Sequence, residues 1–147
     1  MAIKRREEPD LRIAGLSIWV LGREFPDSSD YWDANWLNVC VRVEATQAVV
    51  ETDGPIIRIS ELATFIEELE RLDRTLAGSA SLKCLEPNLD VVIQGNTRGH
   101  AMATIKVTPD HLNQSHEFIF GFDQTYFKPL IAQCSKLLSE YPIKGDG

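Results

Sequence analysis

The sequence predicts an α+β protein: an antiparallel sheet of about six or seven strands with two amphipathic helices packed on one face. Two kinds of pattern support this prediction. Several short segments alternate apolar and polar residues, as half-buried strands do, and two longer stretches repeat apolar residues at helical spacing. The expected strands come in groups rather than singly between helices, which argues against a parallel, doubly wound sheet.

The first half of the chain contains the clearest strand pattern. Four strands are expected there, at residues 11–21, 36–45, 48–52 and 55–59. Every second residue from Leu37 to Val43 is apolar and the residues between are mostly polar, which is typical of an antiparallel sheet with one face open to water. Asp53-Gly54 predicts a tight hairpin turn between the last two strands. Residues 22–34, rich in Pro, Asp and Ser, are expected to form a loop.

The first helix is expected at about residues 61–77. Ser60 can cap it, because a serine hydroxyl accepts a hydrogen bond from the first backbone N–H groups of a helix. Gly78 supplies a C-terminal stop. The apolar residues that define the buried face are Leu62, Phe65, Ile66, Leu69, Leu72 and Leu76. The opposite face is charged, and Glu67 precedes Arg71 by four residues, the order that stabilises a helix.

The second half of the chain repeats the order of strands followed by a helix. Strands are expected around residues 82–84, 89–93, 101–107 and 118–122. Residues 94–99 contain two glycines and predict a turn. A closing helix is expected at residues 125–140, with Pro129 in its first turn because proline deeper in a helix clashes with a preceding carbonyl. The halves have little sequence identity, so a duplicated unit stays an open alternative.

The helices and the alternating strands should share one hydrophobic core. The residues expected to be buried are Leu37, Val39, Val41, Leu62, Phe65, Leu69, Phe120, Phe122, Leu130 and Leu137. With 147 residues the chain can bury such a core in a single domain spanning 1–147, with residues 1–10 as a flexible N-terminal arm. The arm is basic at Lys4-Arg5-Arg6, but no apolar stretch of a secretory signal follows it.

Composition narrows the classes of function. The formal net charge is −7, from 15 basic and 22 acidic residues, which argues against a nucleic-acid-binding face because such faces neutralise phosphates with Lys and Arg. No apolar run is long enough to span a membrane. Cys40, Cys84 and Cys134 are odd in number and far apart, so we interpret them as free thiols of a protein in the reducing cytoplasm.

Candidate chemistry is sparse in this sequence. The three histidines show no metal-ligand spacing and no nucleophile motif is present, so we expect no catalytic site, no metal and no cofactor. Asp33 and Asp123 form a conceivable acid–base pair, but Asp123 is more simply the cap of the closing helix. The glycines at 95 and 99 lack the lysine and the following helix of a phosphate-binding loop.

The most distinctive segment, residues 31–37, reads Tyr-Trp-Asp-Ala-Asn-Trp-Leu. With Trp19, its aromatic side chains could line a ligand-binding cleft. They could equally form a small core under a long loop, with Asp33 and Asn35 holding the loop by local hydrogen bonds. Both interpretations stay open at this point. The preceding loop is acidic and has no Lys or Arg from Glu24 to Asp33, which makes it a candidate docking surface.

Four short motifs follow one another in a recognisable order. They are the segment 31–37, Glu86-Pro87-Asn88-Leu89, Arg98-Gly99-His100 and Asp123-Gln124-Thr125. On these motifs the chain, from Leu16 to Pro142, resembles the WapI-type immunity proteins, antidotes to polymorphic bacterial toxins. The resemblance implies a cytoplasmic protein without enzymatic activity. It also implies that the protein neutralises a cognate toxin by binding its C-terminal domain, which in the namesake system is a tRNA-cleaving nuclease.

An acidic surface would suit such an antidote, because it steers a basic partner toward the protein. We expect partner contacts at Asp27, Asp30 and Asp33 of the acidic loop, with Glu67 and Glu70 of the first helix behind them. No nucleic acid or membrane is expected as a partner, and the oligomeric state stays open. The alternative is a small-ligand-binding domain or an enzyme that uses the Trp, Tyr and Asp side chains at 31–36.

Overall fold

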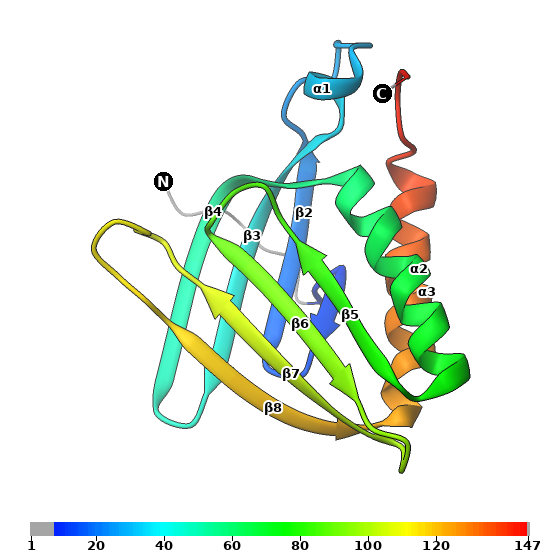
Figure 1. The fold of residues 1–147 in the computed structure, drawn as a ribbon. Helices are drawn as coiled ribbons and strands as arrows, with labels where there is room; N and C mark the ends of the chain where they lie inside the picture. The colour runs from blue at the N-terminus through cyan, green and yellow to red at the C-terminus, as the bar shows by residue number, and fades with distance from the viewer. Residues whose placement is uncertain (1–7, 147) are drawn as a thin grey trace.

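The computed structural model describes residues 8–146, and within that range eight strands form two antiparallel sheets of four strands each (Figure 1). The first sheet contains β1 (Leu11–Ile13), β2 (Leu16–Arg23), β3 (Trp36–Ala45) and β4 (Ala48–Arg58). The second contains β5 (Gly78–Lys83), β6 (Leu89–Gly95), β7 (His100–Val107) and β8 (Glu117–Asp123). The helices are α1 (Tyr31–Ala34), α2 (Ile59–Thr75) and α3 (Phe127–Glu140), and the 3-10 turn η1 (Gln124–Tyr126) precedes α3.

The α+β class and the antiparallel pairing are confirmed, but the prediction of a single sheet of six or seven strands was wrong. The strands pair in sequence order within each half, as β1-β2-β3-β4 and as β5-β6-β7-β8. After β4 the chain passes through α2, which packs on β5. The second sheet therefore starts anew beside the helix instead of extending the first. Each half is four strands in up-and-down order followed by a helix, which is the repeated order that the sequence suggested.

The hydrophobic core lies between the two sheets and the paired helices. Figure 1 shows α2 and α3 side by side along one side of the molecule, where α2 packs on β5 and α3 contacts β1. Both helices are amphipathic, and their apolar faces join the inward-facing residues of the strands in one cluster. Eight of the ten residues expected in the core are at most 2% exposed, namely Leu37, Val39, Val41, Leu62, Phe65, Leu69, Leu130 and Leu137.

The other two expected core residues, Phe120 and Phe122, are only partly buried. They lie on β8, which is the edge strand of the second sheet. An edge strand has a neighbour on one side only, so its inward side chains remain partly open to solvent. On the outer face of β8, Ile119 is 62% exposed. The alternation therefore predicted the correct face of β8 but not its place at the edge.

The predicted hairpin at Asp53-Gly54 was wrong, because β4 runs through these residues as one strand of 11 residues. Gly54 pairs with Val39 and Asp53 with Cys40 across the sheet. Gly54 has a φ of +138°, a conformation that glycine adopts without the strain of a side chain. The sequence pattern predicted a turn at Asp53-Gly54. In the structure, Gly54 instead lets β4 continue with an irregular backbone and pair along the ten residues of β3.

The expected strand 11–21 is divided by a tight turn. Ala14, with a φ of +52°, and Gly15 separate β1 from β2. A Cβ atom at Gly15 would approach the Glu44 carbonyl oxygen to 2.2 Å and the Phe120 ring to 2.6 Å, so only glycine fits between the two sheets there. This turn is also where the first sheet approaches the middle of β8, at the Phe120 ring.

The two long helices occupy nearly the expected ranges but begin differently. In α2 the Glu61 carboxylate accepts a 2.7 Å hydrogen bond from the Arg58 backbone N–H, so the cap comes from Glu61 rather than from Ser60. The helix ends at Thr75, and its C-cap residue Leu76, two residues before Gly78, has a φ of +57°. Before α3, Asp123 accepts a hydrogen bond from the Thr125 N–H at 2.8 Å, as predicted.

Candidate partner-binding surface

The segment Tyr31–Ala34 forms a single helical turn, α1, inside the predicted loop. One oxygen of the Asp30 carboxylate accepts hydrogen bonds from the backbone N–H groups of Trp32 and Asp33, both at 3.2 Å. The Ala34 N–H donates to the Asp30 carbonyl at 2.7 Å. The Asp30 carboxylate therefore caps α1. Asp30 is also exposed, as a partner-binding residue must be.

Asn35 holds this helical turn in place from the interior. It is fully buried, and its side-chain amide donates to the carbonyls of Tyr31 (2.8 Å) and Lys144 (3.0 Å). Its side-chain oxygen accepts from the Lys144 N–H at 2.9 Å. Its backbone carbonyl accepts from the Ile59 N–H at the start of α2, also at 2.9 Å. One residue thus joins α1, α2 and the C-terminal segment.

The C-terminal segment is fastened to the loop by further contacts. The Arg23 guanidinium donates to the carbonyls of Ala34 (2.7 Å) and Pro142 (2.5 Å). The Lys144 ammonium donates to the Pro26 carbonyl at 3.1 Å. Residues 24–34 and 141–146 therefore form one hydrogen-bonded unit, which we call the loop end of the molecule. Figure 1 shows α1 and the C-terminus close together at this end.

The other distinctive motifs also have structural roles. The Asn88 side-chain amide donates to the Thr108 carbonyl at 2.9 Å, which joins the segment before β6 to the end of β7. The Gly99 carbonyl accepts from the Gln124 N–H at 2.8 Å, so two motifs far apart in the sequence meet directly. Gly99 has a φ of +85°, which favours glycine. These three motifs therefore have structural roles in turns and in connections between strands.

The aromatic side chains of the segment gather around one cation, Arg58. Its guanidinium carbon lies 5.9 Å from the ring centre of Tyr31, 5.2 Å from that of Trp32 and 5.7 Å from that of Trp36. Trp36 is the strand partner of Arg58 between β3 and β4. Trp19, which the sequence grouped with these residues, instead lies on β2, pairs with Cys40 of β3 and borders a different depression.

Next to this group, a shallow depression of about 360 Å³ lies between α1, the start of α2 and β5. It is lined by Tyr31, Trp32, Arg58, Ser60, Glu61, Thr64, Ser81 and Lys83. Trp32 is 61% exposed beside it. Both oxygens of Glu61 are engaged, because they accept the N–H groups of Arg58 (2.7 Å) and Leu85 (2.8 Å). Burial raises the pKa of Glu61, although these two hydrogen bonds oppose that shift.

All five acidic residues expected to contact a partner are exposed. Asp27 and Asp33 lie at the loop end, on either side of Asp30. Glu67 lies one helical turn beyond Thr64, which lines the depression, and so continues the same exposed side of α2. Glu70 instead borders a groove between α2 and α3. The fold thus places the three loop acids at the loop end, Glu67 on the exposed side of α2 next to Thr64, and Glu70 on a neighbouring face.

The conceivable acid–base pair of Asp33 and Asp123 is not formed. Asp33 belongs to α1 and Asp123 ends β8, and these elements lie at opposite ends of the molecule (Figure 1). Within residues 8–146, no group of three or more His, Cys, Asp or Glu side chains could hold a metal ion. All three cysteines are free thiols, and burial raises the pKa of Cys134 to about 12. No helix in this part of the chain is long and apolar enough to cross a membrane.

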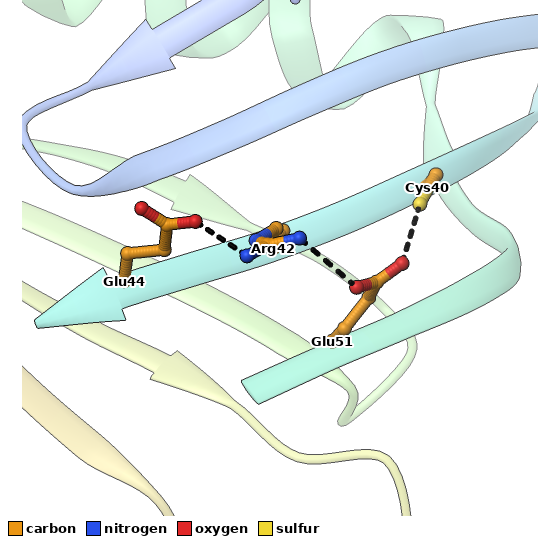
Figure 2. A network of polar contacts seen from close by, with 4 residues as sticks. All are labelled: Cys40, Arg42, Glu44 and Glu51. Atoms are coloured by element: carbon orange, nitrogen blue, oxygen red, sulfur yellow. Dashed lines mark hydrogen bonds and ion pairs between the residues drawn. The ribbon is translucent and has the colours of Figure 1, made fainter. Parts of the chain in front are cut away.

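A polar network on the outer face of the first sheet joins β3 to β4 (Figure 2). The Arg42 guanidinium lies 2.5 Å from a Glu44 oxygen and 3.8 Å from an oxygen of Glu51, its direct strand partner. The Cys40 thiol contacts the other Glu51 oxygen at 3.6 Å. Cross-strand pairs of opposite charge of this kind stabilise a sheet modestly. We therefore assign this network a structural role.

Sequence reasoning missed Arg58, Thr64 and Lys83, which lie near the aromatic residues only in the folded chain. Arg58 was placed in an ordinary strand, and its pairing with Trp36 depends on β4 being continuous. The sequence did contain one indication of a continuous β4, because a β3 of ten residues needs a partner strand of similar length. The Asp53-Gly54 dipeptide led instead to the prediction of a turn.

These observations define a class of protein: a two-sheet α+β protein whose loop end is an exposed unit held together by hydrogen bonds. Comparison with family models identifies the class more closely. The model of the immunity protein WapI-like family matches residues 10–142, and the chain belongs to that family. Comparisons with curated proteins and with solved structures found no match.

Proposed function

We propose that this protein is a cytoplasmic antidote that neutralises a cognate polymorphic toxin by binding the toxin's C-terminal domain directly, without enzymatic activity of its own. Membership of the WapI-like immunity family across residues 10–142 is the observation that carries the proposal. A nuclease is the first toxin activity to test, because an acidic antidote suits a basic, nucleic-acid-binding partner.

The loop end is the surface proposed to meet the toxin. It presents Asp27, Asp30 and Asp33, and the exposed side of α2 adds Glu67, with Glu70 on the adjoining face. The net charge of −7 would raise the rate of encounter with a basic domain. Hydrogen bonds from Asn35, Arg23 and Lys144 hold this end in place, so little conformational entropy is lost on binding.

The alternative of a small-ligand site or an active site at residues 31–36 has weaker support. Ligand sites usually enclose most of the ligand, whereas this depression is shallow and Trp32 beside it is 61% exposed. The carboxylate that lines it, Glu61, is already engaged by two backbone N–H groups. An open surface with an exposed aromatic ring fits a protein partner better.

Co-expression with a cognate toxin domain, sought among the genes that neighbour this one, tests the proposal. Wild-type protein should restore growth. The double variant Asp27→Lys, Asp33→Lys should weaken or abolish rescue, while Asp30 is left intact because it caps α1. A control variant, Glu117→Lys with Asp53→Lys, changes the net charge equally at exposed positions of the edge strands β8 and β4.

Three outcomes are decisive. Rescue that is lost in the loop variant and kept in the control supports both the function and the surface. Rescue that survives in both variants removes the loop from the binding site. If the wild-type protein neither rescues growth nor binds the toxin domain, the proposed function is wrong.

A further inference from the structure

Within residues 8–146, no carboxylate lies within ion-pair distance of Arg58, the cationic group at the loop end. Arg58 is held by the rings of Tyr31, Trp32 and Trp36, at 5.2 to 5.9 Å from its guanidinium carbon. The Arg58 Nε is buried and has no hydrogen-bond partner in that part of the chain. The aromatic rings thus fix the guanidinium while leaving hydrogen-bond donors unused.

A partly buried guanidinium with unused hydrogen-bond donors destabilises the protein unless an acceptor group pairs with it. Burying part of a guanidinium requires compensation, which contact with aromatic faces supplies only in part. A guanidinium stacked on rings keeps its N–H donors in one plane, the geometry that binds a carboxylate in bidentate fashion. Glu61 is near enough to feel the charge of Arg58 but forms no ion pair with it, and each Glu61 oxygen already accepts one backbone N–H group.

Besides Arg58 and Glu61, the one other charged residue that lines the depression is also a cation. Lys83 is exposed and, in the described part of the chain, forms no ion pair. Ser60, Thr64 and Ser81 add hydroxyl groups to the lining. The centre of this surface is therefore rich in donors and locally cationic, although the protein as a whole carries a charge of −7. An acidic group fits this depression, and a basic one does not.

Trp32 adds the second component of a binding centre. It is 61% exposed and packs edge-on against Tyr31 with 5.1 Å between ring centres. Trp, Tyr and Arg are the residue types that most often dominate the energy of a protein interface. An indole that covers an ion pair also excludes water, and this strengthens the electrostatic attraction.

From these observations we propose that the depression formed by Trp32, Arg58 and Lys83 is the energetic centre of the toxin-binding surface. It receives an Asp or Glu side chain of the toxin domain, which pairs with Arg58 beneath the Trp32 ring. The surrounding acids, Asp27 and Asp33, then act on the rate of encounter rather than on the lifetime of the complex. This inference rests on the proposed function and assigns that surface its central contact.

The test measures the affinity of an inactivated form of the cognate toxin domain, by calorimetry. Arg58→Gln and Trp32→Ala should each weaken binding by about 30-fold or more, the effect of an interface hot spot. Matched controls are Arg71→Gln, an exposed arginine on α2, and Ile119→Ala, an exposed apolar residue on β8. The controls should change the affinity less than about threefold.

Two further variants keep the result interpretable. If Arg58→Gln does not fold, the exposed Lys83→Glu variant tests the same cationic lining and should also weaken binding. Arg58→Glu should be rescued by changing one acidic residue of the toxin domain to Arg, which would identify the partner carboxylate. Loss of binding in Arg58→Gln without loss in Arg71→Gln supports the proposal.

The contrary outcomes separate this inference from the proposed function. If the wild-type protein binds the toxin domain and the Arg58, Trp32 and Lys83 variants bind equally well, the inferred centre is wrong and the function stands. If the wild-type protein does not bind, both are wrong. If free glutamate at micromolar concentration saturates the depression, the site serves a small carboxylate and the docking proposal is overturned.

Discussion

At the scale of single residues, Asn35 explains why the segment 31–37 is so distinctive. Its side chain makes three hydrogen bonds in a fully buried position, two as a donor and one as an acceptor. Buried polar groups are tolerated only when they are paired in this way. The sequence suggested that Asn35 ties the loop down locally, but its bonds to Lys144 join residues 109 positions apart in the chain.

We predict that Asn35→Ala lowers the free energy of unfolding by about 2–4 kcal/mol, because it removes three buried hydrogen bonds and leaves backbone groups unpaired. Urea denaturation would measure the loss. Asn113→Ala, at an exposed loop position with one side-chain hydrogen bond to Asp110, should lose less than about 1 kcal/mol. Equal effects of the two substitutions would show that Asn35 does not hold the loop end.

Cys134 provides a pH-dependent test of burial. Its pKa is raised from 9.0 to about 12, so the folded state keeps the thiol proton to a higher pH than the unfolded state does. This contribution to stability is complete below pH 9 and is lost as the pH rises toward about 12. Between about pH 8 and pH 10, wild type should lose about 1 kcal/mol more than Cys134→Ala in urea denaturation. Parallel losses would mean that the thiol is not buried in solution.

At the scale of elements, periodicity predicted where strands and helices lie but not how they pair. Strand β3 was predicted at its observed ends, and α2 within two residues, because apolar spacing is a local property. Whether β4 and β5 belong to one sheet depends on where α2 packs and where it directs the chain. Local sequence patterns do not contain this information. The depression around Arg58 depends on the same long-range pairing and could not be predicted from the sequence.

Two glycines in strands should respond differently to a β-branched side chain. A Cβ atom has room at both Gly54 and Gly121, but only Gly54 has a positive φ, of +138°. Gly54→Val should therefore lower the free energy of unfolding by about 1–3 kcal/mol through backbone strain. Gly121→Val should be neutral or stabilising, since valine favours strands. A harmless Gly54→Val would indicate that β4 is interrupted there.

The apolar face of α2 can be tested with one truncation. Leu69 is fully buried, so Leu69→Ala should cost about 2–5 kcal/mol, the sum of lost burial and the cavity left behind. Glu70→Ala, at the neighbouring exposed position, serves as the control and should be within about 0.5 kcal/mol of wild type. A cost below about 1 kcal/mol for Leu69→Ala would contradict the assigned helix face.

At the scale of the whole molecule, three of the four distinctive motifs maintain the fold, and the fourth also faces solvent. Asn88, Gly99 and Asp123 make hydrogen bonds that join turns, strands and the start of α3. In the segment 31–37, Asn35 is buried and holds the loop end, whereas Trp32 and Asp33 are exposed. The surface proposed to bind the toxin therefore includes part of this motif. Each half of the chain forms its own four-stranded sheet followed by a helix.

Direct binding is the central claim, and the most direct test is the affinity of the purified protein for the inactivated cognate toxin domain. The account predicts a stable complex whose association slows several-fold as salt rises from about 0.05 to 0.5 M, because screening removes the steering by surface acids. The absence of any complex at micromolar concentrations would contradict the claim, whatever effect the protein has on growth.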